Sequence, residues 1–351
     1  MTTLTEEAAE LLIAGRAFDP APPGFVGAAV DLPLASPGLP AGDVARLATR
    51  PALRHGFLTA RSPRLAVVSG PPSPGLAVSL SRMTDDLRAA RPILGAFAVP
   101  DGRIGGPSAT GAGMRAGRPE AAGGIRVGLE AGLEGGGPLG LPRRWILAHK
   151  LAPVLAAAFA NAPAAGWRSV RQAAHRHLPV VPAGDPRPAW TAYVLEAPAL
   201  DGPSLRERFR AGERPAAAEL ARHLESLRPP VAARGHLELD VADTQPGDGW
   251  RLPIAVAATL LDDPAAALDA EAATADLPAE PRLWERAARD ALTDPVLAAA
   301  ARDCFLAAYA ALARQGAARN LRDALADYTE RYVLRGRTPA DGILDRLAAH
   351  P

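Results

Sequence analysis

The pattern of apolar residues changes near the middle of the chain, and this change limits the fold class. In the first half, short apolar runs at 25–30, 64–68 and 93–99 are bounded by glycine or proline and have the length of β-strands. The second half is predominantly helical in its spacing. A strand-rich half (1–138) followed by a helix-rich half (139–351), without repeating strand–helix units, predicts a single domain with an α+β fold.

Capping signals and apolar spacing locate the expected helices. They span 3–16, 73–91 (opened by Ser73-Pro74), 143–161, 168–177, a helix capped by Ser204, 216–227, 252–261, 281–292, 294–314, 319–333 and 338–349. Between them, the stretch 102–142 holds 14 glycines and few large apolar residues. Such a segment has little to bury, so we expect a glycine-rich loop in which only 125–131 forms a strand.

The charge balance excludes some classes of partner. The chain has 39 basic and 38 acidic side chains, and Lys150 is its only lysine. A formal charge of +1 gives no basic footprint for nucleic acid, so no nucleic-acid partner is expected. No apolar run approaches the roughly 20 residues of a membrane span, and the start of the chain lacks the pattern of a signal peptide. We therefore expect no membrane partner, a cytoplasmic location, and a lone Cys304 that is buried as a small apolar residue.

A late run with strict alternation, 234–242, holds the most notable cluster of ionisable residues. As a strand it places His236, Glu238 and Asp240 on one face and leucine and valine on the other. Such a row of side chains can hold Mg²⁺, which prefers carboxylate oxygens and water. It can equally face solvent or pair with arginines, and the pattern alone leaves both interpretations open.

Two arginines three residues apart form a second candidate. Arg168 and Arg171 in the segment WRSVRQ share a helical face and could hold a carboxylate or a phosphate. The alternative is an ordinary basic first turn of a helix.

Four segments carry a resemblance to a known family. They are FANAPAAGWRSVRQ (159–172), HLESLRPPVAARGHLELDVADTQPGDGW (223–250), LPIAVAATLLDDP (252–264) and ERYVLRGRTPADGIL (330–344). Together they resemble the actinobacterial glutamate-cysteine ligases of ergothioneine biosynthesis. The resemblance is specific over 139–264, continues to the C-terminus and covers most of the chain.

The resemblance implies a reaction. In this family ATP and Mg²⁺ convert the γ-carboxylate of glutamate into an acyl phosphate, which the amine of cysteine then displaces. The family fold is similar to that of glutamine synthetase, with a curved, mostly antiparallel sheet and helices packed outside it. Gathering several anions in one site requires metal ions and arginines.

The resemblance also implies which residues would act. Glu238, Arg168 and Arg171 would be the catalytic residues. ATP would be bound through Asp31, Asp240, Asp243 and Gln245. The metal ligands would be Glu238, Asp31 and Glu130.

Several positions depart from the family pattern where its chemistry is expected. Ala29 replaces the first of two acids and only Asp31 remains, while Arg61 and Val67 replace two glutamates of the next motif. Asp240 stands where the family has an arginine. No glutamate occurs between residues 11 and 119, the region in which the family places most of its metal-binding glutamates.

Two functions therefore remain open. The chain is either an ATP-dependent ligase that joins glutamate and cysteine, or a degenerate paralogue that acts by binding or regulation, with a possible protein partner. Ligase chemistry could survive if Asp31, Glu130, Glu238 and Asp240 formed a rearranged acidic set.

Overall fold

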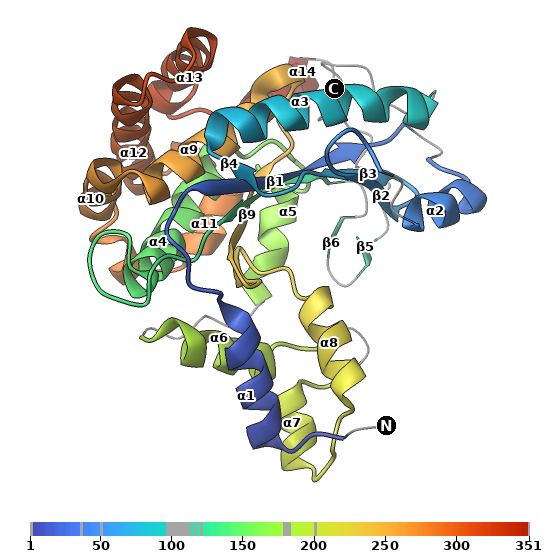
Figure 1. The fold of residues 1–351 in the computed structure, drawn as a ribbon. Helices are drawn as coiled ribbons and strands as arrows, with labels where there is room; N and C mark the ends of the chain where they lie inside the picture. Colours follow the sequence, from blue (N-terminus) through green and yellow to red (C-terminus); the bar gives the residue numbers. More distant parts are fainter. Residues whose placement is uncertain are drawn as a thin grey trace.

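An antiparallel sheet runs through the middle of the molecule in the computed structural model (Figure 1). The described residues are 3–35, 38–49, 52–95, 114–115, 118–119, 122–177, 184–199 and 202–349. The sheet consists of β1 (Phe25–Pro33), β2 (Phe57–Ser62), β3 (Leu65–Ser69), β4 (Ser73–Pro74), β7 (Gly124–Leu129), β8 (Val231–Ala233) and β9 (Leu237–Asp243). The order is β2-β3-β1-β7-β9-β8, β4 pairs with the start of β1, and every pairing is antiparallel. A separate pair is formed by β5 (Met114–Arg115) and β6 (Arg118–Pro119).

Helices account for most of the second half of the chain. The α-helices are α1 (Glu6–Ala17), α2 (Ala41–Ala48), α3 (Leu76–Leu94), α4 (Leu141–Ala158), α5 (Val170–Ala173), α6 (Pro186–Glu196), α7 (Leu205–Arg210), α8 (Ala217–Ser226), α9 (Arg251–Asp262), α10 (Pro264–Ala273), α11 (Leu283–Arg289), α12 (Pro295–Arg314), α13 (Arg319–Arg331) and α14 (Pro339–Ala349). Short 3-10 helices are η3 (Ala174–His177), η4 (Gly247–Trp250), η5 (Leu277–Ala279), η6 (Ala291–Thr293) and η7 (Val333–Arg335). The predicted α+β class with a mostly antiparallel sheet is confirmed, whereas the likeness to glutamine synthetase stays a prediction.

The two faces of the sheet differ because side chains alternate along each strand. On β1, Val26, Ala28 and Val30 are buried on the face that α3 covers, and α9 packs beside α3 (Figure 1). The opposite face carries Ala29 and Asp31 on the same strand. This second face is the polar face, and it carries the charged residues discussed below.

A group of helices extends from the side of the sheet opposite to α3. It contains α1, α6, α7 and α8, which Figure 1 shows below the sheet. Its base is fixed by aromatic contacts in which Trp145 of α4 meets Phe18 and Trp190 edge-on, with ring centroids 5.3 and 6.4 Å apart. The capping box predicted at Ser204 is confirmed, since Glu207 and Ser204 exchange hydrogen bonds at the start of α7. Figure 1 shows α8 on the polar side of the sheet.

Within the described residues, α12 is the one helix with the length and hydropathy of a membrane span. Its residues Leu297, Phe305 and Leu312 are buried in the core between neighbouring helices. One such helix is weak evidence for a membrane protein, since core helices pass the same test. Cys304 lies on the same buried side, as predicted, and burial raises its thiol pKa to about 12.

Three local predictions were wrong. Ile93 does not begin a strand because it lies in the last turn of α3, and residues 96–99 of that predicted strand lie outside the described residues. Ser73-Pro74 pairs with β1 and does not cap the helix, which begins only after Gly75 at a φ of +80°. The helix expected over 168–177 is a single turn, α5, followed by η3.

Candidate functional site

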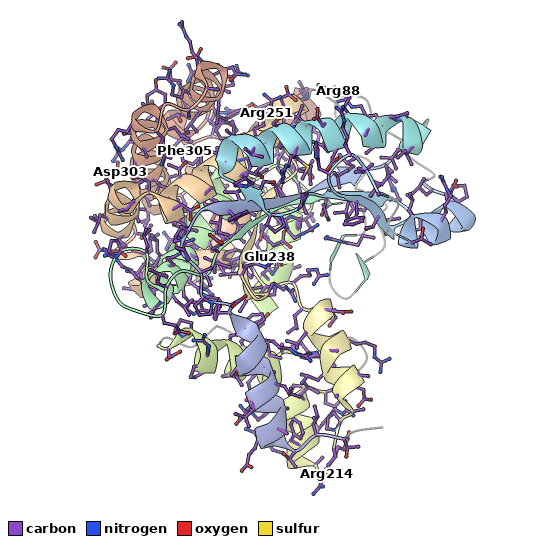
Figure 2. All side chains as sticks on the ribbon, viewed as in Figure 1. Arg88, Arg214, Glu238, Arg251, Asp303 and Phe305 are labelled. Carbon is purple, nitrogen blue, oxygen red and sulfur yellow. The ribbon has the colours of Figure 1, made fainter. Side chains whose placement is uncertain are left out.

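A cleft of about 650 Å³ lies on the polar face of the sheet, next to the segment that leaves α8. Its floor includes Ala29 and Gly128 of two central strands and Ser69 of β3. Figure 2 shows Glu238 below the sheet, on the side from which the α1 and α7 helices extend. The charged residues that line the cleft are Arg61, Arg126, Arg228, Arg234, Glu225 and Glu238. Arginines therefore outnumber carboxylates on the walls.

Asp31 lies beneath this cleft, 1% exposed, and its carboxylate already has cationic partners. Arg61 Nη1 is 3.1 Å from Oδ2, and Arg126 Nη1 is 3.1 Å from Oδ1. The backbone N–H of Gly124 also donates to Oδ2 at 3.1 Å. Burial lowers the pKa of Arg126, but Asp31, Asp240 and Glu238 more than offset this effect and leave its pKa raised. The carboxylate is thus paired within the protein.

The sheet register explains how Arg61 reaches a strand that is not its neighbour. Val67 of β3 lies directly opposite Asp31 and offers no oxygen ligand. Between Ala60 and Ser62 the β2–β3 register shifts, so Arg61 is the extra residue of a bulge. Bulges redirect side chains, and here the long arginine crosses β3 to reach β1. Arg61 and Val67, the residues at which the resemblance implies glutamates, therefore both lie beside Asp31.

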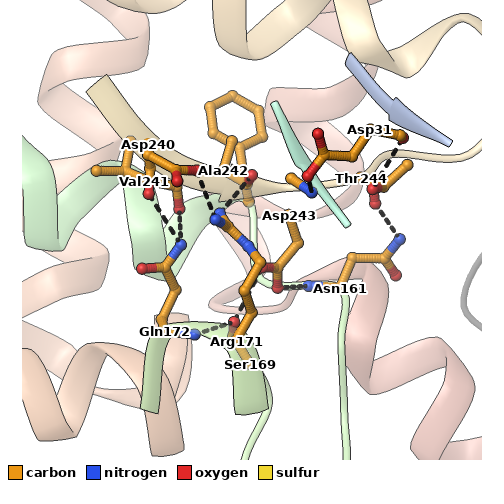
Figure 3. A network of polar contacts seen from close by, with 12 residues as sticks. Asp31, Asn161, Ser169, Arg171, Gln172, Asp240, Val241, Ala242, Asp243 and Thr244 are labelled. Carbon is orange, nitrogen blue, oxygen red and sulfur yellow. Dashed lines mark hydrogen bonds and ion pairs between the residues drawn. The ribbon is translucent and has the colours of Figure 1, made fainter. Parts of the chain in front are cut away.

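Arg171 is the centre of a second buried network (Figure 3). Its Nη1 is 2.6 Å from Asp240 Oδ1, its Nε is 2.9 Å from Asp243 Oδ1, and its Nη2 donates to the carbonyl of Ala242. Burial lowers the pKa of Arg171, yet the two carboxylates outweigh burial and raise it overall. Asp243 also accepts hydrogen bonds from Ser169 Oγ and the Asn161 N–H, while burial pushes its own pKa upward.

Arg168 and Gln245 are also held by neighbouring groups. Arg168 Nε is 2.7 Å from Asp341 Oδ1, which ties it to the start of α14. Gln245 is buried, and its Nε2 donates to the carbonyls of Phe159 and Asp243 at 2.9 and 3.0 Å. Gln245 faces a different cavity, of about 410 Å³, beneath α3. Neither residue lines the cleft on the polar face.

The alternating strand β9 directs its acids toward arginines. Glu238 lines the cleft and lies 3.3 Å from Arg234 Nε, while Asp240 is paired with Arg171. Of the two interpretations of this strand, pairing with arginines therefore holds for both Glu238 and Asp240. His236 lines the cleft beside Glu238, and burial lowers its pKa.

Glu130 lies apart from the other three acids of the rearranged set, because Asp31, Glu238 and Asp240 all lie near enough to Arg126 to raise its pKa. Glu130 accepts the Phe25 N–H at 3.2 Å, near the start of β1. Asp31 is six residues further along that strand, or about 20 Å at the usual rise. Across the described parts of the chain there is no group of three or more His, Cys, Asp or Glu side chains that could hold a metal ion. Mg²⁺ requires an octahedron of accessible oxygens. Asp31, Asp240 and Glu238 do not fit this requirement, because each is paired with an arginine.

The sequence predictions missed three arginines of the cleft. Arg126 alternates with Gly128 on β7, which was a usable signal because both must share a face with the acids of β9. Arg228 and Arg234 flank the short strand β8, and Arg228 is half-buried. Burial, and after it the positive charges of Arg234 and Arg61, lower the Arg228 pKa to about 10. Only the long-range register brings these residues together.

Comparisons with known proteins identify the family to which this chain belongs. The profile of glutamate-cysteine ligase family 2 (GCS2) matches residues 125–351. The glutamate–cysteine ligase EgtA of Mycolicibacterium smegmatis is 33% identical over 64% of this chain and 57% of its own length. The glutamate–cysteine ligase EgtA of Mycobacterium tuberculosis is 30% identical over 80% of this chain and 75% of its own length. The chain thus spans little more than half of the first relative. Matches of this extent show that the chain belongs to glutamate-cysteine ligase family 2.

Proposed function

We propose that this chain is a member of the glutamate-cysteine ligase family that has lost the metal-dependent ligase reaction and keeps its cleft as a ligand-binding pocket. Its role would be binding or regulation. The location in the cytoplasm, the single-domain organisation and a possible protein partner are parts of the same proposal.

The observation that supports it best is the pairing of Asp31. Arg61 and Arg126 both contact this carboxylate at 3.1 Å, so two guanidinium groups lie where the resemblance implies a metal ligand. Removing a charged group that stabilises the transition state typically slows catalysis 10²- to 10³-fold, and here several such groups are replaced at once. ATP and Mg²⁺ would lack the acidic donors that a two- or three-metal site needs.

The ligase itself is the second candidate. Family membership supports it, as does Glu238, which lines the cleft at the strand position where the resemblance implies a catalytic acid. In that case glutamate and cysteine would be joined to γ-glutamylcysteine for ergothioneine biosynthesis, with ATP as the phosphoryl donor.

An ADP-release assay separates the two candidates. The full chain is incubated with glutamate, cysteine, ATP and MgCl₂, and the EgtA of Mycolicibacterium smegmatis serves as the positive control. We expect no ADP release above that of a reaction without enzyme.

Matched variants make the result decisive. Glu238→Ala removes the cleft acid, whereas Glu330→Ala removes an exposed glutamate on α13. Turnover that disappears in Glu238→Ala and persists in Glu330→Ala would overturn the proposal. Turnover that is equal in both variants belongs to a co-purifying enzyme and leaves this chain inactive, as proposed.

A further inference from the structure

Four guanidinium groups converge on one cleft from different parts of the chain. Arg61 comes from β2, Arg126 from β7, and Arg228 and Arg234 from the two ends of β8. Two of the three nearby carboxylates contact particular arginines: Asp31 contacts Arg61 and Arg126, and Glu238 contacts Arg234. The third, Glu225, also lines the cleft. Arg228 adds a further positive charge to this set.

The charges in this cleft repel one another. Burial is the main cause that lowers the pKa of Arg228; Arg234, Arg61 and Arg126 each lower it further, and Glu238 opposes them only in part. Backbone contacts position Arg228, because its Nη1 donates to the Leu227 carbonyl at 2.8 Å. The protein therefore holds several cations in a half-enclosed site, where electrostatic interactions are stronger than in water.

We propose that the cleft binds a phosphorylated small molecule through direct contacts between its phosphoryl oxygens and the arginines, with no divalent cation between them. Guanidinium forks match phosphate oxygens in pairs, and a group with two or more negative charges satisfies several forks at once. Phe57, half exposed on the cleft wall, offers an apolar surface for the remainder of the ligand. The inference names the ligand class of the pocket in the proposed function, and it rests on that proposal.

Pyrophosphate is a suitable probe for isothermal titration calorimetry on the full chain. We expect binding in EDTA at least as tight as in MgCl₂, because the arginines replace the metal. Binding that requires MgCl₂ would overturn the inference, as would citrate binding in place of pyrophosphate, since citrate tests for a site selective for carboxylates. These results are independent of the ADP-release assay, so the two proposals fail separately.

Arg228→Gln tests the contribution of the most crowded cation. It should weaken pyrophosphate binding by about 10-fold or more, as expected for loss of one charge-assisted contact. Arg222→Gln, an exposed position on α8 outside the cleft, is the matched control and should leave the affinity unchanged. Equal affinities in the two variants would contradict the inference. Arg61→Gln gives the same test at a more exposed position if Arg228→Gln unfolds.

Glu238→Gln distinguishes an arginine site from a metal site by the sign of its effect. Removing this negative charge should tighten pyrophosphate binding by roughly 3- to 10-fold if the oxyanion meets arginines directly. If a divalent cation bridges the ligand, the same substitution removes a metal ligand and weakens binding. Weaker or unchanged binding in Glu238→Gln would therefore overturn the inference.

Discussion

Arg61 of β2 reaches across β3 to contact Asp31 of β1 at 3.1 Å, so the acid for which the family resemblance implies a metal-binding role is paired with a cation of the same chain. Arg126 contacts the other carboxylate oxygen of Asp31. The function of the cleft and the stability of the sheet are consequently linked at this carboxylate.

Asp31→Asn should destabilise the fold strongly. It leaves the Arg61 and Arg126 guanidinium groups without their shared counter-charge, and loss of one partner from a buried pair costs about 3–5 kcal/mol. Urea unfolding measures the change. Asp43→Asn, which removes a surface ion pair with Arg46, is the control and should change stability by no more than about 0.5 kcal/mol. Similar effects in both variants would contradict the pairing described above.

Introducing an acid at position 61 alone should not create a metal site. In Arg61→Glu, Arg126 still contacts Asp31, so MgCl₂ should leave the melting temperature unchanged. In the double variant Arg61→Glu/Arg126→Gln, two carboxylates lie together without a cation, and MgCl₂ should raise the melting temperature by about 1–3 °C. Scanning calorimetry in EDTA and in MgCl₂ provides the comparison. A rise in the melting temperature of the unaltered chain in MgCl₂ would contradict this prediction, because it would show that Asp31 is accessible to the metal ion.

Gly124→Ala should disturb the network around Arg171. A Cβ at this position would lie 2.6 Å from Arg171 Cζ, so the buried guanidinium would have to move from its two aspartates. We expect a loss of about 1–3 kcal/mol in the free energy of unfolding. Gly135→Ala meets no atom within 4 Å and should be almost neutral. The comparison requires only urea unfolding curves, and a neutral Gly124→Ala would refute the tight packing of Arg171.

Stability should fall below neutral pH partly through His149. This histidine packs edge-on against Trp145, and burial lowers its pKa to about 4. The unfolded chain binds this proton near pH 6.5, whereas the folded chain resists protonation until about pH 4, so stability is lost as the pH falls through that window. Between pH 7.5 and 5 the loss from this group is about 2 kcal/mol. His149→Gln should remove that part of the dependence. Parallel pH profiles of unfolding for the two proteins would contradict this assignment.

The sequence was informative where the pattern is local. Alternation in 234–242 correctly placed Glu238 on a polar face, and the capping signal at Ser204 correctly marked the start of α7. The short apolar runs predicted β1 and β3 to within a few residues at each end. Periodicity and capping depend on neighbouring residues, so they can be interpreted without knowledge of the fold.

The arrangement of the cleft depends on contacts between distant residues. Arg61 reaches Asp31 only because of a bulge in β2, and no local pattern in its surroundings marks a bulge. The ends of β8 bring Arg228 and Arg234 beside strands more than 100 residues earlier in the chain. β2, β8 and α2 were missed because their short segments carry little periodic signal, and tertiary pairing decides their conformation.

The two guanidinium groups on Asp31 come from strands on opposite sides of β1. A mutation that reverses only one of them leaves the other in place, so it disturbs a stable pair without recovering an accessible acid. Under the proposed loss of the metal site, regaining it would require both arginines to change, and the variant with only one change would be less stable without any gain of activity. The two contacts on Asp31 would therefore make that loss hard to reverse by single mutations.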